Sequence, residues 1–137
     1  MDHPFDLRSA SPDGRHSAHF AAAGEVRFGP FYFALALDGR AFGERIFGAA
    51  HLWSPDGAWL AVQEWLTLDY SAGPITALVL IDLRQGRAAT LARATKAFLV
   101  PLEFAGRLLA YHEERAGQAG ERLEAEITSI AEWRALG

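Results

Sequence analysis

The stretch WSPDGAWLAVQEW, residues 53–65, joins a tight turn to an alternating strand. Its Ser-Pro-Asp-Gly, at 54–57, also occurs at 11–14. In such a turn proline presets φ at the second position, and aspartate is tolerated at the third. Glycine accepts the left-handed conformation that follows. Apolar runs flank both copies, so each copy predicts a tight link between antiparallel strands, with Gly14 and Gly57 at positive φ.

Two further turn signals repeat in the same order as the tetrapeptide. Gly-Pro at 29–30 recurs at 73–74, and Gly-Arg-Ala at 39–41 recurs at 86–88. Three collinear signals at nearly one spacing predict internal repeats. We expect a single domain over 1–137, with units at approximately 11–53, 54–104 and 105–137. Residues 1–10 are a candidate strand for completing the last unit.

Short runs with the two-residue alternation of strands lie between the turn signals. The first unit contains such runs at 15–22, 31–37, 41–47 and 49–53. The second contains them at 58–66, 75–83, 88–93 and 97–104. The third contains 108–112 and 122–127, and 131–136 fits either a strand or a short helix. The sequence therefore predicts an all-β fold of about eleven antiparallel strands joined by hairpins.

The stretches LWSPDGAWLAV (52–62) and ALVLIDLRQGRAATLA (77–92) together resemble one blade of a β-propeller of the TolB-like and prolyl-oligopeptidase-like kind. In that family a W/F-SPDG turn leads into the innermost strand of a blade. The resemblance implies about three consecutive blade-like antiparallel sheets, whereas closed propellers generally have four to eight blades. An open arc or half-propeller is therefore expected.

Composition and motifs exclude several classes of function. A net charge of −4 disfavours binding to nucleic acid, and the absence of cysteine excludes thiolate metal sites and cysteine nucleophiles. No apolar run could span a membrane and the N-terminal MDHPFDLRS lacks a signal-peptide core, so we expect a cytoplasmic protein. The histidines lack ligand spacing, and no G-x-S-x-G or Walker motif occurs. We therefore predict no metal, no cofactor and no catalytic residue.

Glu64 is a carboxylate in an otherwise aliphatic row of the strand that follows the second tetrapeptide. Alternation places it with Leu60, Val62, Leu66 and Leu68. A buried carboxylate without a partner is costly. Glu64 therefore either pairs with an arginine or backbone amides, or serves as an acid or ligand-binding group.

Two loops form the candidate partner-binding surface. The loop at 67–73 carries Asp69 and Tyr70 directly after Trp65, and the equivalent loop of the first unit, 23–29, carries Arg27 and Phe28. Loops at one end of a repeat array gather into a binding surface. Because Trp, Tyr and Arg are favoured as interface anchors, these five residues are the predicted site for a protein partner. The alternative is that the two loops only connect the strands of their hairpins.

Three functions fit these observations. The first is a non-enzymatic β-repeat protein acting through protein–protein interaction, such as an inhibitor or a bacterial immunity-type protein. The second is a small-ligand binder or minor enzyme, which requires Glu64, Asp69 and Tyr70 to converge on one cleft. The third is a structural subunit whose function is assembly.

The two ends of the repeat array raise the question of a homodimer. An end blade exposes one face unless something covers it. The residues expected on these faces are Leu109, Tyr111 and Leu123 at one end, and Phe20, Phe31 and Phe33 at the other. Either a second copy covers both ends, giving a two-fold symmetric dimer, or loops and the terminal segment mask them in a monomer.

Overall fold

The computed structural model describes residues 4–26 and 30–136, and all regular structure in this part of the chain is β-strand. It holds no helix that could cross a membrane. The all-β prediction is confirmed. The described residues form twelve strands: β1 Leu7–Ala10, β2 Ser17–Glu25, β3 Phe31–Leu37, β4 Arg40–Trp53, β5 Trp59–Trp65, β6 Ile75–Asp82, β7 Arg87–Thr95, β8 Phe98–Ala105, β9 Leu108–Arg115, β10 Gln118–Ala119, β11 Leu123–Glu126 and β12 Arg134–Ala135.

The strands pair into two open antiparallel sheets. The larger sheet has eight strands in the order β1-β2-β3-β4-β5-β6-β7-β12, so it is a simple meander with β12 added at its end. The smaller sheet is built around β9, which pairs with β8, β10 and β11. Neither sheet closes on itself. The predicted open arrangement is therefore present.

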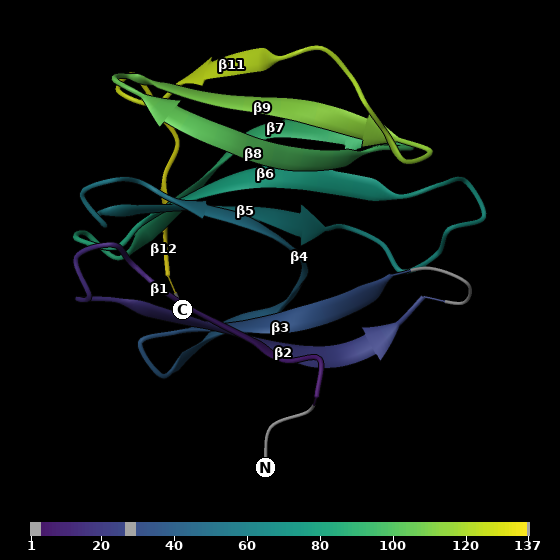
Figure 1. The fold of residues 1–137 in the computed structure, drawn as a ribbon, viewed down its shortest axis with the longest axis horizontal. Helices are drawn as coiled ribbons and strands as arrows, with labels where there is room; N and C mark the ends of the chain where they lie inside the picture. The colour runs from purple at the N-terminus through teal and green to yellow at the C-terminus, as the bar shows by residue number, and fades with distance from the viewer. Residues whose placement is uncertain (1–3, 27–29, 137) are drawn as a thin grey trace.

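Three layers are stacked along the molecule (Figure 1). β1, β2 and β3 form the first, β5, β6 and β7 the middle one, and β8, β9 and β11 the third. One core cluster, containing Leu60, Val62 and Val79, lies between the first and middle layers. A second, containing Ala61 and Leu78, lies between the middle and third layers. Successive residues of β5 and β6 point to opposite faces, so alternate residues enter the two clusters. The outer layers cover both clusters, and both faces of the middle layer are therefore buried.

The long strand β4 differs from the prediction of two strands at 41–47 and 49–53. It runs without interruption from Arg40 to Trp53 and passes from the first layer to the middle one (Figure 1). Its first half pairs with β3 and its second half with β5, while Ile46 and Phe47 pair with both. The first two layers are therefore halves of one continuous sheet, although the sequence predicted separate sheets.

The two chain ends pair differently from the expectation that 1–10 completes the last unit. That expectation is wrong, because β1 pairs with β2 and so lies at the edge of the first layer. Closing a hairpin through the turn at 11–14 costs less chain entropy than reaching the far unit. At the other end, 131–136 contains a strand rather than a helix: β12 pairs with β7, next to the middle layer.

The two Ser-Pro-Asp-Gly turns make the same set of hydrogen bonds. In each, the glycine amide donates to the serine carbonyl at 2.9 Å, and the serine hydroxyl donates to the aspartate carboxylate. Gly14 has a φ of 74° and Gly57 a φ of 75°, which confirms the predicted left-handed conformation. The turns also touch, because a Cβ built on Gly57 would overlap the carboxylate of Asp13.

The apolar faces expected at the two ends of the array lie largely inside the molecule, so the expectation that they are exposed is wrong. Phe20 and Phe33 are buried in the first core cluster, and Leu109 is buried in the second. Phe31, Tyr111 and Leu123 are partly buried. These residues point inward because each outer layer turns its apolar face toward the middle layer. Its outward face carries the alternate positions.

Candidate functional site

Trp65 is the centre of an aromatic cluster to which all three layers contribute. Its indole lies 6.1 Å from the ring of Tyr32 on β3, 6.0 Å from Tyr70 in the loop after β5, and 5.7 Å from Phe98 on β8, measured between centroids. Tyr70 and Phe98 also contact one another at 6.4 Å. We call these four residues the aromatic cluster.

Hydrogen bonds through Gln63 fix the orientation of Trp65. The indole Nε1–H donates to Gln63 Oε1 at 2.8 Å, and Gln63 Nε2 donates to the carbonyl of Leu99 on β8 at 2.8 Å. Gly48 leaves room for this arrangement, because a Cβ there would overlap Gln63 Oε1 and lie 2.7 Å from Trp65 Nε1. Trp65 is therefore held rigidly between the middle and third layers, with only 4% of its surface exposed.

An apolar groove of about 560 Å³ lies on one side of the aromatic cluster. Its walls come from β3, β4 and β8, and Trp65 and Phe98 form part of them. The polar residues on its lining are Gln63, whose amide is already engaged, and Glu114. Its other lining residues include Phe31, Phe33, Ala50 and Val100. The groove can accommodate an apolar side chain.

A smaller acidic pocket of about 300 Å³ lies on the other side of the cluster, where the two predicted loops meet. Tyr32 and Tyr70 line it together with Glu25 and Asp69, the charged residues that the described part of the chain places there. The Ser71 amide donates to the Asp69 carboxylate at 2.9 Å and lowers its pKa. Burial raises the pKa of Tyr70, so its hydroxyl remains protonated. The pocket therefore combines aromatic rings with negative charge.

The predicted partner-binding residues have different outcomes. The structure brings Trp65, Asp69 and Tyr70 together at this one end, and their role in binding a partner stays a prediction. Arg27 and Phe28 lie outside the described residues. The 23–29 loop nonetheless contributes to the same end through Glu25 and Val26.

Glu64 lies on the opposite face of β5 from Trp65 and belongs to a different cleft. The Arg45 side chain donates to it twice, from Nε and Nη2, each at 2.7 Å. This is the arginine partner that one of the two interpretations predicted. Glu64 lines a cleft with Arg45, whereas Asp69 and Tyr70 line the acidic pocket. The structure therefore does not bring Glu64, Asp69 and Tyr70 to one site.

Sequence reasoning missed Gln63 and Phe98 as parts of this end of the molecule. Gln63 had one signal, because it is a polar residue between Ala61 and Trp65 on an otherwise apolar face of the strand. Phe98 had none, since nothing local to β8 indicates that it lies against Trp65. Contacts between layers are set by how the sheets stack.

Comparisons with known proteins add no family. No protein-family model matches the chain, and no curated protein or solved structure is significantly similar to it. Within 4–26 and 30–136, the structure contains no group of three or more acidic or histidine side chains that could hold a metal ion.

Proposed function

We propose that this protein is a non-enzymatic binding protein that docks a protein partner at the end carrying the aromatic cluster. The observation that supports this most is the position of Trp65 and its neighbours between an apolar groove and an acidic pocket. Aromatic side chains held in fixed positions are favoured as interface anchors because they bury much surface at little entropic cost.

The chemistry of the two depressions defines the partner. An apolar side chain fits the groove, and a neighbouring lysine or arginine fits the acidic pocket. There Glu25 and Asp69 attract the cation, and the faces of Tyr32 and Tyr70 add cation–π attraction. The net charge of −4 also attracts a basic partner over longer range. An acidic inhibitor or immunity-type protein would act in this way, by covering a basic surface of its partner.

The propeller-like resemblance remains part of this proposal. The matching hydrogen bonds of the two Ser-Pro-Asp-Gly turns support a common origin of the first two units. The continuous β4 distinguishes the arrangement from separate blades. We infer that the chain is a blade-repeat protein in which neighbouring units have merged into one sheet.

The partner chemistry can be tested by selecting a random peptide library against the protein and measuring Kd for the peptides obtained. We expect peptides with an aromatic or aliphatic residue next to lysine or arginine. The variant Asp69→Lys should raise Kd by about ten-fold or more, because it places like charge against the basic residue. Asp69 is exposed, so the fold should tolerate the change.

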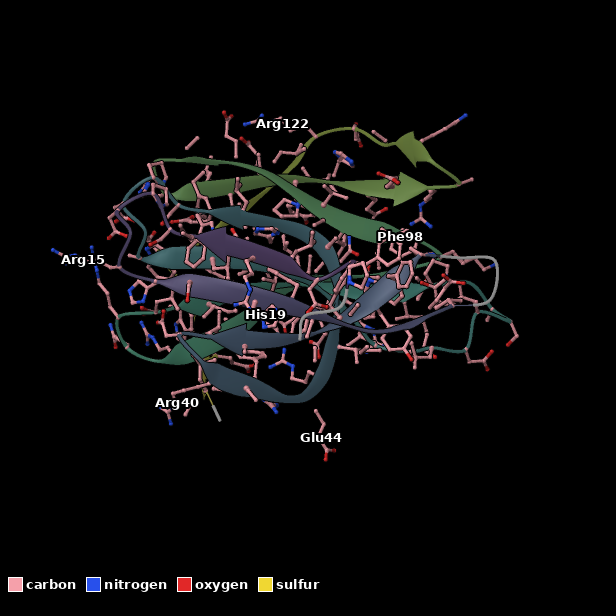
Figure 2. The ribbon with its side chains drawn as sticks, turned by 60° about the horizontal axis from the view of Figure 1, so that its bottom comes forward. Arg15, His19, Arg40, Glu44, Phe98 and Arg122 are labelled. Carbon is pink, nitrogen blue, oxygen red and sulfur yellow. The ribbon has the colours of Figure 1, made fainter. Side chains whose placement is uncertain are left out.

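The matched control is Glu44→Lys, which makes the same change of charge. Glu44 is exposed, and Figure 2 shows it pointing outward, away from Phe98. Its Kd should equal that of the unmodified protein. Selection of peptides without a basic residue, or equal weakening by both variants, would contradict the proposal.

A further inference from the structure

We propose that a second site, on the opposite face of β5, binds a small anion that carries an apolar body. The site is a cleft of about 600 Å³ lined by Arg45, Arg93 and Arg134 with Glu64 and Glu132, and we call it the arginine cleft. It does not depend on the proposed function, because Trp65 and the acidic pocket lie elsewhere. Its volume is within the range of pockets that hold small molecules.

The floor of the arginine cleft is a row of small residues on the middle layer. Glu64, Ala77 and Arg93 pair across β5, β6 and β7, so their side chains stand side by side on one face. Val79, Ala88 and Thr90 complete the floor on this face, and Ala89, which pairs with Leu80 on the other face, borders it through its backbone. Because these side chains are short, they leave an apolar hollow below the charged rim.

Arg45 is held in place on one wall of the arginine cleft. Its guanidinium donates two hydrogen bonds to the buried Glu64 and lies over the ring of Phe42, 4.7 Å from the centroid. These bonds use Nε and Nη2, and within the described chain Nη1 makes no hydrogen bond. A ligand that accepts from Nη1 would therefore meet a donor whose conformation is already fixed, which reduces the entropy lost on binding.

Arg93 and Arg134 supply positive charge that has no partner among the described residues. Among the described residues, neither side chain makes a hydrogen bond or an ion pair. Arg93 stands on β7, and Arg134 stands on β12 beside Ala88. The cleft thus carries three positive and two negative groups. One added anion would balance these charges.

Two other arginines without a partner among the described residues lie at the ends of hairpin turns, outside the arginine cleft. Arg40 and Arg107 also lack a side-chain partner within the described residues, but they flank hairpin turns, and Figure 2 shows Arg40 pointing outward. Neither lines the cleft. The planar fork of arginine matches carboxylate and phosphate oxygens, so either group fits the cleft rim. The small-residue floor favours a flat or branched apolar body attached to that group.

The test is a titration of the protein, followed by amide NMR, with phenyl phosphate, benzoate and the uncharged benzyl alcohol. We expect the two anions to shift the amides of Ala77 and Ala88–Thr90, and benzyl alcohol to leave them unchanged. The tighter of the two anions identifies phosphate or carboxylate as the natural head group. Inorganic phosphate alone should bind more weakly than phenyl phosphate, because it lacks the apolar body.

The decisive comparison uses two double variants with the same change of charge. Arg93→Gln with Arg134→Gln should raise Kd for the tighter anion by about ten-fold or more. Arg40→Gln with Arg107→Gln should leave it unchanged. All four arginines are exposed, so both variants should fold, as thermal melting will verify. The proposal would be overturned if both double variants weakened binding equally, or if benzyl alcohol bound as tightly as the anions. It would also be overturned if about 10 mM anion shifted no amide, because a Kd above that concentration is too weak for specific recognition.

Discussion

Gly14 and Gly57 have the same backbone conformation but different surroundings. Both take the left-handed region that follows a Pro-Asp turn. A Cβ at Gly14 would meet nothing within 4 Å, whereas one at Gly57 would overlap the Asp13 carboxylate. That carboxylate accepts hydrogen bonds from the Ser11 hydroxyl at 2.6 Å and the Arg15 amide at 3.1 Å. The second turn therefore packs on the atoms that stabilise the first.

Alanine substitution at the two glycines should separate backbone strain from this contact. Gly14→Ala should lower the free energy of unfolding by about 1–2 kcal/mol, the cost of a left-handed alanine. Gly57→Ala should lower it by about 1 kcal/mol more, because Asp13 must move and lose a hydrogen bond. Urea denaturation measures both. An equal loss in the two variants would show that the Asp13 contact contributes nothing.

Strand β8 is an edge strand whose free side is bonded by side chains of the middle layer. Thr76 Oγ1 donates to the Ala97 carbonyl at 2.8 Å and accepts from the Leu99 amide at 3.2 Å, and Gln63 donates to the Leu99 carbonyl. Pro101, farther along β8, has no N–H to offer. The edge thus has few unpaired backbone N–H and C=O groups with which another strand could pair. The same hydrogen bonds fix the third layer onto the middle layer.

Thr76→Val should test this role, since valine has nearly the same shape without the hydroxyl. Thr76 is buried, so the change leaves the Leu99 amide and the Ala97 carbonyl without partners. Each unpaired group should lower the free energy of unfolding by about 1–3 kcal/mol. Hydrogen exchange at the Leu99 amide should accelerate along with this loss. The control is Thr95→Val on β7, an exposed position, where a change within about 0.5 kcal/mol is expected. Unchanged exchange at Leu99 in Thr76→Val would contradict the role.

The stacking of three layers determines which faces the molecule can offer to a partner. The middle layer is apolar on both faces and is covered on both. The outer layers turn Phe20, Phe33 and Leu109 inward, which removes the reason for a second copy to cover the ends. The surfaces that carry unusual chemistry are instead the groove and acidic pocket at one end and the arginine cleft on the other face of β5.

Light scattering at micromolar concentration should therefore give a particle of 15.0 kDa. Of the six apolar side chains expected at the interface, Phe20, Phe33 and Leu109 are buried and the other three are partly buried. A stable dimer needs a more substantial apolar contact than these leave exposed. A particle of twice that mass would show that a different surface pairs. Repeating the measurement with Asp69→Lys would then show whether the acidic pocket is part of it.

The turns, most of the strands and the loop at 67–73 could be predicted from the sequence. Proline and glycine restrict φ within a few residues, and alternation is a property of one strand, so both can be predicted locally. Alternation also places Glu64 and Trp65 on opposite faces. Asp69 and Tyr70 lie in the loop beyond this strand, so only the structure separated them from Glu64.

How the strands combine into layers depends on tertiary packing. Several features join residues from different turns or layers. They are the continuity of β4, the pairing of β1 with β2, and the contacts of Gln63 with Leu99 and of Gly57 with Asp13. Each depends on sheet register and on the apolar surface buried when layers stack, which no local stretch encodes. For the same reason Phe98 and the three arginines of the cleft were not predicted. Phe98 meets Trp65 only when the third layer stacks on the middle one. The three arginines meet only when β4 crosses between layers and β12 pairs with β7.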